Sequence, residues 1–262
     1  MDIRPLLKRI EENKALIAER RPLTPVEVKE LDAYFRIGMT YTSNALEGNS
    51  LDITETKILL EDGITVGGKP IRDCYEAVGH ANAYDFMLEA ARSEPFLFSE
   101  DMILRLHKLF YISIEPDNAG IYRKHQVIIT GTDFIPPEAE KVPLLMRDMV
   151  KSLTERWGNT HPVQLAAFAH QKLVDIHPFT DGNGRTARLL MNLILINQGY
   201  QIVSIPPVLR REYINAIKKS QSGGGITSEA LAKFIAECEI ESQKDFCRMF
   251  RLKLPERNDI AR

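Results

Sequence analysis

The chain has 262 residues, 44% of them hydrophobic and 27% charged, which is enough apolar material to bury a sizeable core and argues against disorder. The formal net charge of −2 argues against a nucleic-acid binder, because such proteins usually carry a strong basic excess. The sequence has no apolar signal-peptide core and no run of about 20 apolar residues. We therefore expect a soluble cytoplasmic protein without a membrane span. Three cysteines without a Cys-x-x-Cys pair predict reduced thiols.

Helix signals dominate the chain from its N-terminal third onward. Residues 24–27, Thr-Pro-Val-Glu, combine an N-cap hydroxyl, a proline at the first helical position and a glutamate at the third, and Gly48 is placed to end that helix. Residues 52–55 repeat the capping pattern, and Gly63 ends the second helix. Further helices are expected over about 72–91, from Ser99, over 142–157, 162–176, 183–198 and 208–219, and from Thr227.

One segment departs from the helical pattern. Residues 126–130, Gln-Val-Ile-Ile-Thr, are rich in β-branched side chains, and Gly131-Thr132-Asp133 follows as turn material before Pro136-Pro137. The pattern predicts a short β-hairpin on an otherwise helical body.

The segment from His177 to Arg188 joins two of the expected helices. Pro178 disfavours helical geometry at the preceding residue, so His177 should stand at the end of the first helix. Gly182 and Gly184 let the backbone turn and approach a ligand closely. The second helix begins there, and its unpaired N–H groups and positive dipole end predict an anion-binding site.

Charged side chains in the same segment predict what that anion is. Arg185 and Arg188 lie three residues apart and share one helical face. Two guanidinium groups beside an anion site suit a polyphosphate better than a single carboxylate. Asp181 adds a hard oxygen ligand, which suits Mg²⁺ bridging phosphates. Each feature alone is common by chance, but their combination within twelve residues predicts a catalytic phosphate-handling site.

This segment resembles the signature of the Fic family, His-Pro-Phe-x-(Asp/Glu)-Gly-Asn-Gly-Arg-x-x-Arg, at every defined position. The resemblance extends over roughly Phe98 to Ala236. It implies an all-α fold, a Fic-type helical bundle with a small β-hairpin flap and a helical N-terminal extension. The expected division is a helical N-terminal region at 1–97, a Fic domain at 98–236, and a C-terminal helix with a polar tail at 237–262.

The resemblance also implies a role for each motif residue. His177 is the general base that takes a proton from the target hydroxyl, and Asp181 holds Mg²⁺, with Mn²⁺ as an alternative, between the α- and β-phosphates of ATP. Arg185 contacts the β-phosphate, Arg188 the γ-phosphate, and Phe179 anchors the loop. The implied nucleotide-binding set is Thr130, Gly131, Thr132, Asp133, Asp181, Gly182, Asn183, Gly184, Arg185, Thr186, Ala187, Arg188, Tyr213 and Gln221, the last two beside the adenine and ribose by their spacing.

Residues 43–48, Ser-Asn-Ala-Leu-Glu-Gly, resemble the inhibitory motif of the same family, (Ser/Thr)-x-x-x-Glu-(Gly/Asn). Ser43 and Glu47 are four residues apart and would share one helical face, with Gly48 closing the motif. In Fic proteins this glutamate pairs with the second motif arginine and blocks the productive position of the γ-phosphate. The resemblance therefore implies a pair between Glu47 and Arg188, and an inhibitory helix that precedes the Fic domain.

The function implied is protein adenylylation, the transfer of AMP from ATP to a Ser, Thr or Tyr hydroxyl of a target protein with release of pyrophosphate. The target would bind along the flap hairpin by strand addition, and self-modification and a homo-oligomer are both open. Three alternatives remain: a different transfer such as phosphorylation or phosphocholination, the reverse removal of AMP with Glu47 orienting a water, and a non-catalytic nucleotide-sensing module. Intact His177 and Asp181 argue against the last.

Overall fold

The computed structural model describes residues 2–65, 67–222 and 229–253, and these residues form helices and connecting loops without any strand. The all-helical class expected from the sequence is therefore confirmed. The helices are α1 (Arg4–Glu19), α2 (Pro25–Ala45), α3 (Ile53–Asp62), α4 (Ile71–Ala91), α5 (Glu100–Tyr111), α6 (Val142–Arg156), α7 (Pro162–Ile176), α8 (Asn183–Asn197), α9 (Arg210–Ser222) and α10 (Glu229–Met249), with 3-10 turns at Pro116–Asn118, Ala139–Lys141 and Pro207–Leu209.

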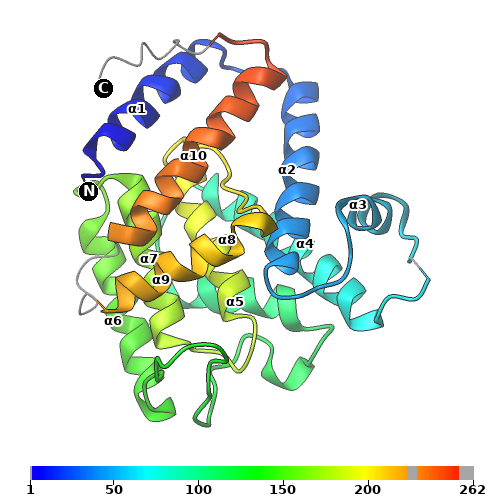
Figure 1. Cartoon of the computed structure of the whole chain (residues 1–262), viewed down its shortest axis with the longest axis vertical. Coiled ribbons are helices and arrows are strands. Elements are labelled where there is room, and N and C mark those ends of the chain that lie inside the picture. The colour runs from blue at the N-terminus through cyan, green and yellow to red at the C-terminus, as the bar shows by residue number, and fades with distance from the viewer. Residues whose placement is uncertain (1, 66, 223–228, 254–262) are drawn as a thin grey trace.

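Helix α8 is the central element of the bundle. It packs against α7, α4, α5 and α2, and Figure 1 shows it surrounded by other helices. A helix buried on all sides can be apolar around its whole circumference, and its polar residues then need partners. Asn192 has them: its Nδ2 donates to the carbonyls of Arg188 and Val203 at 3.0 Å each, and its Oδ1 accepts from the N–H of Val203 at 2.7 Å. Asn192 therefore ties α8 to the segment that carries Val203.

The N-terminal helices attach to two different parts of the bundle. Helix α2 packs on α3 and α4 and touches α8, whereas α1 packs on α10. Figure 1 shows α2 standing on the side of the bundle that carries α3, away from α1. Helix α10 runs without a break through position 236, where the sequence analysis ends the Fic domain. The three-part division of the chain stays a prediction.

Side-chain caps fix the starts of α2 and α3 as the sequence predicts. Thr24 accepts from the N–H of Glu27, and the Glu27 carboxylate accepts from the N–H of Thr24 in return. Asp52 and Glu55 form the same reciprocal pair at α3, and Gly63 ends that helix in the left-handed region with φ 68°. Reciprocal capping satisfies N–H groups that a helix start leaves unpaired, so these boundaries are set by local sequence.

The predicted β-hairpin is wrong in its strands. The chain does reverse at Gly131, with φ 80°, but no ladder forms across it, and the contact between the two arms is a hydrogen bond from Gln126 Nε2 to the carbonyl of Pro136 at 2.9 Å. A lone two-stranded hairpin is marginal unless one face is buried, and here Ile128 is 93% exposed and Ile135 80% exposed. Prolines 136 and 137 also lack the N–H that a ladder needs.

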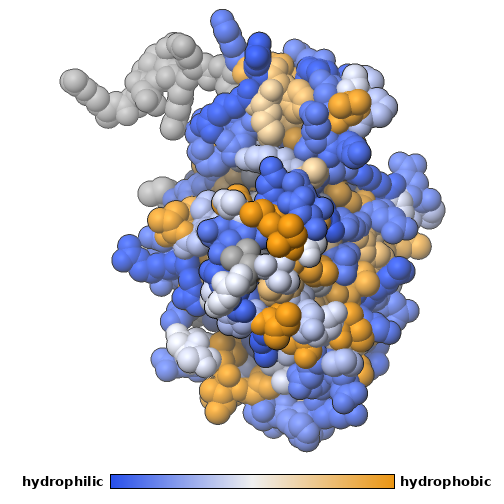
Figure 2. All heavy atoms as spheres, turned by 90° about the vertical axis from the view of Figure 1, so that its right-hand side faces the viewer, coloured by the Kyte–Doolittle hydropathy of each residue, from blue (hydrophilic) through white to orange (hydrophobic). Residues whose placement is uncertain are grey.

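The face that carries α3 is mostly hydrophilic, and its hydrophobic side chains lie in separate small groups (Figure 2). A groove of about 1060 Å³ lies between α2, α3 and α10, and none of its lining residues belongs to the segment 177–188. No described helix is long and apolar enough to cross a membrane. The three cysteines, Cys74, Cys238 and Cys247, are free and buried. Most of the expected polar tail, residues 254–262, lies outside the described residues.

Candidate active site

The loop between α7 and α8 is held in shape by Asn183 at the start of α8 and by His107 of α5. The Asn183 amide accepts from the N–H of Phe179 at 2.9 Å and donates to the carbonyl of Phe179 at 2.8 Å. The buried Phe179 ring stacks on the imidazole of His107, with the centroids 3.7 Å apart. His107 Nδ1 accepts from the N–H of Gly120, so Nε2 carries the proton that it donates to the carbonyl of Asp181 at 3.0 Å. Burial lowers the pKa of His107 to about 4, which keeps this support neutral.

His177 stands at the C-terminal end of α7, as the proline after it predicts, and its backbone lies in the left-handed region with φ 50°. Its Nδ1 lies 3.3 Å from the carbonyl of Val174. A carbonyl only accepts hydrogen bonds, so Nδ1 is protonated and Nε2 is the basic nitrogen. Burial lowers the pKa of His177 below its ordinary value of 6.5. The imidazole is therefore neutral at pH 7 and has a lone pair to accept a proton.

Two glycines at the start of α8 have no room for a side chain. Gly182 has φ 77°, and an added Cβ would lie 2.8 Å from the ring of Phe110. At Gly184 an added Cβ would collide with the carboxylate of Glu47. The Glu47 carboxylate therefore rests against the N-terminus of α8, where unpaired N–H groups and the helix dipole favour negative charge. It occupies the place that the sequence assigns to a phosphate.

The guanidinium of Arg188 is held from three sides, and Arg188 is only 3% exposed. Its Nη2 donates to Glu47 Oε1 at 2.7 Å and to the carbonyl of Ser43 at 2.8 Å, its Nε to Ser43 Oγ at 2.9 Å, and its Nη1 to the hydroxyl of Tyr213 at 3.2 Å. Burial raises the pKa of Glu47, but Arg188 and then Arg185 more than offset it and hold the pKa below 4.5. The pair is ionised at neutral pH. Ser43 and Glu47 thus meet Arg188 together, although Glu47 follows the last turn of α2.

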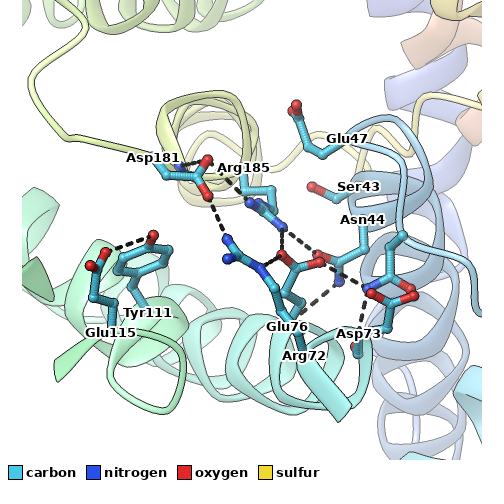
Figure 3. A network of polar contacts seen from close by, with 12 residues as sticks. Ser43, Asn44, Glu47, Arg72, Asp73, Glu76, Tyr111, Glu115, Asp181 and Arg185 are labelled. Atoms are coloured by element: carbon cyan, nitrogen blue, oxygen red, sulfur yellow. Dashed lines mark hydrogen bonds and ion pairs between the residues drawn. The ribbon is translucent and has the colours of Figure 1, made fainter. Parts of the chain in front are cut away.

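A second ionic network joins α4 to the loop before α8, and Figure 3 shows its members converging. Glu76 Oε1 accepts from Arg185 Nη1 at 3.1 Å and from Arg72 Nε at 3.2 Å. Arg72 Nη2 donates to Asp181 Oδ2 at 3.0 Å, and Arg185 Nη1 lies 3.4 Å from Asn44 Oδ1. Arg185 and Glu76 are both buried. Arg185 is therefore fixed within the protein and is not part of a solvated helix face.

Arg123 ties the segment 124–138 to the loop that carries His177. Its Nε donates to the carbonyl of His177 at 2.8 Å, and its N–H to the carbonyl of Pro178 at 2.9 Å. The same guanidinium donates to the carbonyl of His125 at 3.0 Å and to that of Pro137. Both ends of the reversing segment are thus held beside the candidate base, which is where the sequence analysis expects the flap.

The outlying residues predicted to bind nucleotide have protein partners. Tyr213 is 2% exposed, and its hydroxyl pairs with His170 Nε2 at 2.7 Å as well as with Arg188. Gln221 Nε2 donates to Asp175 Oδ1 at 2.9 Å, and the carbonyl of Gly131 accepts from Lys218 on α9 at 2.7 Å. Tyr213 therefore supports Arg188 from behind. Contact of these residues with a base or ribose stays a prediction.

Several residues that shape the site were missed by the sequence reasoning. His107 and Arg123 support the loop through backbone carbonyls, and Arg72 and Glu76 reach Asp181 and Arg185 from about 110 residues away in the chain. The one local signal was the four-residue spacing of Arg72 and Glu76, which matches a helical ion pair. Such a pair is usually a solvated surface feature, so its spacing gave no reason to place it at the site.

The segment 97–195 matches the family model described as the Fic/DOC family. The chain therefore contains a domain of the Fic/DOC family. Two curated relatives are named Protein adenylyltransferase Fic. The protein of Drosophila mojavensis is 34% identical, and the match covers 91% of this chain and 46% of the relative. The protein of Drosophila melanogaster is 36% identical, and the match covers 79% of this chain and 41% of the relative. The chain thus spans less than half the length of these relatives.

Solved structures share the fold along nearly the whole chain. A segment of Fic-1 from C. elegans superposes with a TM-score of 0.86 at 29% identity, and the match covers 95% of this chain and 72% of that one. A Fic domain containing signaling protein from Bacteroides thetaiotaomicron superposes with a TM-score of 0.83 at 27% identity, covering 96% of this chain and all of that one. The helices that precede residue 97 are therefore part of the shared structure.

Proposed function

We propose that this chain transfers AMP from ATP to a hydroxyl group of a target protein and releases pyrophosphate. One observation carries the proposal: a neutral imidazole with a basic Nε2, that of His177, stands at the loop leading into the anion-binding first turn of α8. Arg185 and Arg188 follow within that helix. The name Protein adenylyltransferase Fic, given to the Drosophila relatives, supports the same activity.

In the proposed reaction His177 acts as the base, and the start of α8 with its two arginines binds the phosphates. Nε2 of His177 takes the proton of the target hydroxyl while the hydroxyl oxygen attacks the α-phosphorus. The bond between the α-phosphorus and the oxygen bridging to the β-phosphate breaks, and its electron pair leaves with pyrophosphate. Positioning and charge stabilisation dominate such transfers. A positioned general base contributes about 10²–10⁴-fold in rate.

The cradle consists of the N–H groups at Gly182 to Gly184 and of two arginines. Arg185 would contact the β-phosphate, and Arg188 the γ-phosphate. The Glu47 carboxylate rests at this place and is bonded to Arg188 at 2.7 Å. A triphosphate therefore has to displace Glu47 before its γ-phosphate can reach Arg188, and this is the basis for proposing that Glu47 inhibits the transfer.

Asp181 fits the role of a magnesium ligand. Its side chain is 43% exposed at the mouth of the site, and no group of three potential metal-ligating side chains occurs among the described residues. Mg²⁺ commonly binds through one or two carboxylates together with substrate phosphates and waters. When bound, the ion neutralises phosphate charge and stabilises the leaving pyrophosphate. Asp181 would orient it, and Mn²⁺ would be an alternative.

The segment 124–138 is where we propose that an extended part of the target binds. Its backbone has no ladder partners, and two of its isoleucines are exposed, Ile128 and Ile135. Strand addition supplies main-chain hydrogen bonds and alternate side-chain contacts. Arg123 holds this segment next to His177, so a bound strand would bring its hydroxyl toward the base. A segment of a second copy could bind in the same way, which would give self-modification.

The reverse reaction, hydrolytic removal of AMP, is a second candidate, and it is favoured by the ionised state of Glu47 beside the cradle. An ionised carboxylate at this position could orient a water toward a phosphodiester.

Labelled ATP distinguishes AMP transfer from phosphorylation and from nucleotide sensing without catalysis. AMP transfer predicts protein labelling from α-labelled ATP and none from γ-labelled ATP. Labelling from the γ-position would indicate phosphorylation, and binding without labelling would indicate a sensing module.

A further inference from the structure

We propose that Arg72 is an internal cation that competes with the metal ion for Asp181 and so sets the metal requirement of the site. The inference rests on the proposed function, because it assigns Asp181 to the metal that accompanies ATP. It concerns a residue outside the motif: Arg72 lies in the first turn of α4, and its Nη2 donates to Asp181 Oδ2 at 3.0 Å (Figure 3).

Both carboxylate oxygens of Asp181 are engaged by internal donors. Oδ1 accepts from the N–H of Gly182 at 2.6 Å and lies 3.5 Å from Arg185 Nη2, and Oδ2 accepts from Arg72. A magnesium ion binds a carboxylate oxygen at about 2.0–2.1 Å. A guanidinium 3.0 Å from Oδ2 would then face a divalent cation at very short range, and like charges at such separations repel strongly. One cation has to leave Oδ2 when the other binds.

Two arginines contact Asp181, and only Arg72 is exposed enough to move away from it. The side chain of Arg185 is 3% exposed, its guanidinium lies over the ring of Phe110 at 4.3 Å, and it is paired with Glu76. The side chain of Arg72 is 55% exposed. Its Nε remains bonded to Glu76 at 3.2 Å, so the outer part of the guanidinium can swing away from Asp181 without losing its anchor.

Glu76 lowers the free-energy cost of moving Arg72 away from Asp181. Its carboxylate also accepts from Asn49 Nδ2 at 3.0 Å, so it stays hydrogen-bonded whichever way Arg72 points. Breaking the half-exposed contact between Arg72 and Asp181 costs little, since exposed ion pairs contribute weakly. Arg72 therefore binds Asp181 Oδ2 weakly and reversibly. The expected effect on metal-dependent binding is a factor of about two to five, the range that exposed pairs give.

The test measures binding directly and does not depend on turnover. Titration calorimetry gives the Kd of a non-hydrolysable ATP analogue for the full-length chain in the Glu47→Gly background, once with Mg²⁺ and once with EDTA. The ratio of the two values is the gain in affinity due to the metal. We expect Arg72→Ala to raise this ratio about two- to fivefold. Arg72→Gln, which keeps most of the side-chain length without the charge, should do the same.

Arg92→Ala is the matched control, because Arg92 ends the same helix, has a side chain that is 52% exposed and pairs with Asp32 at 2.8 Å. It should leave the ratio unchanged. An unchanged ratio in Arg72→Ala would overturn the inference, and so would a lower one, which would show that Arg72 helps to bind the metal-nucleotide complex. A raised ratio in a protein that never labels a target from α-labelled ATP would retain the competition and overturn the proposed function alone.

Discussion

Glu47 Oε1 and Arg188 Nη2 are 2.7 Å apart, and the same carboxylate lies against Gly184 in the first turn of α8. One carboxylate therefore meets both a motif arginine and the helix N-terminus. A γ-phosphate would require the same guanidinium, and charge-assisted contacts of this kind are among the stronger polar interactions in proteins. The pair links residues 141 positions apart in the chain, and it connects the end of α2 to the candidate phosphate site.

Replacing the candidate base should separate chemistry from binding. We expect His177→Ala to lower AMP transfer by about 10²–10⁴-fold and to leave the Kd for ATP nearly unchanged, because the cradle and arginines hold the phosphates. Initial rates with α-labelled ATP and calorimetric titration measure the two quantities. Full activity in the purified variant would exclude His177 as the base.

The pH dependence of transfer should report the lowered pKa of His177. Because the neutral imidazole is the base, the rate should be constant above the folded-state pKa and decline as the pH falls through it, with its midpoint below 6.5. The free energy of unfolding should also decline as the pH falls below about 6.5, because the unfolded imidazole binds a proton more readily. Single-turnover rates from pH 5 to 8, with unfolding followed in parallel, test this. A midpoint above 6.5 would contradict the burial argument.

Asp181 should carry the metal dependence of the reaction. We expect Asp181→Ala to lose transfer activity, since pyrophosphate would leave without its counter-charge. A Mg²⁺ titration of the residual rate compares the variant with the parent. The same Mg²⁺ dependence at unchanged rate would mean that other residues hold the metal.

Gly182 should tolerate no side chain. An alanine there would meet the ring of Phe110 at 2.8 Å and would also adopt a φ of 77°. We therefore expect the free energy of unfolding to fall by about 2–5 kcal/mol, from strain of about 1–2 kcal/mol plus overpacking of about 1–3 kcal/mol. Gly158 has a similar φ of 74° with open space around it. Gly158→Ala should therefore cost only the backbone strain. Chemical denaturation of the two variants checks the difference, and equal losses would exclude the steric contribution.

Local signals in the sequence predicted much of the fold. The reciprocal caps at Thr24 and Asp52 and the left-handed Gly63 depend on residues within one turn of each other, and all are confirmed. The hairpin was predicted from the β-branched composition of 126–130, from the turn residues at 131–133 and from the flap that the family resemblance implies. That prediction failed because strand formation also needs a buried face, which Ile128 lacks.

The site was predictable as far as its residues are adjacent in the chain. The segment 177–188 predicted a base, an anion cradle and an arginine pair, whose roles stay predictions. Through the family resemblance, the spacing of Ser43 and Glu47 predicted the contact between Glu47 and Arg188 that the structure contains. The supports of the site depend on packing between distant helices. Nothing near His107 in the sequence points to Phe179, so its stacking could be seen only in the structure.

The most direct test of the account is the rate of protein labelling from α-labelled ATP in three forms of the full chain: the parent, Glu47→Gly, and Glu47→Gly/Arg188→Ala. Removing the carboxylate frees Arg188 to anchor the γ-phosphate and align the α-phosphate, and misalignment of about 1 Å can cost ~10²-fold in rate. We therefore expect Glu47→Gly to label at least about tenfold faster than the parent, and the double variant to lose that gain because its anchor is gone. Labelling by Glu47→Gly that is no faster than by the parent would contradict the inhibitory role of Glu47.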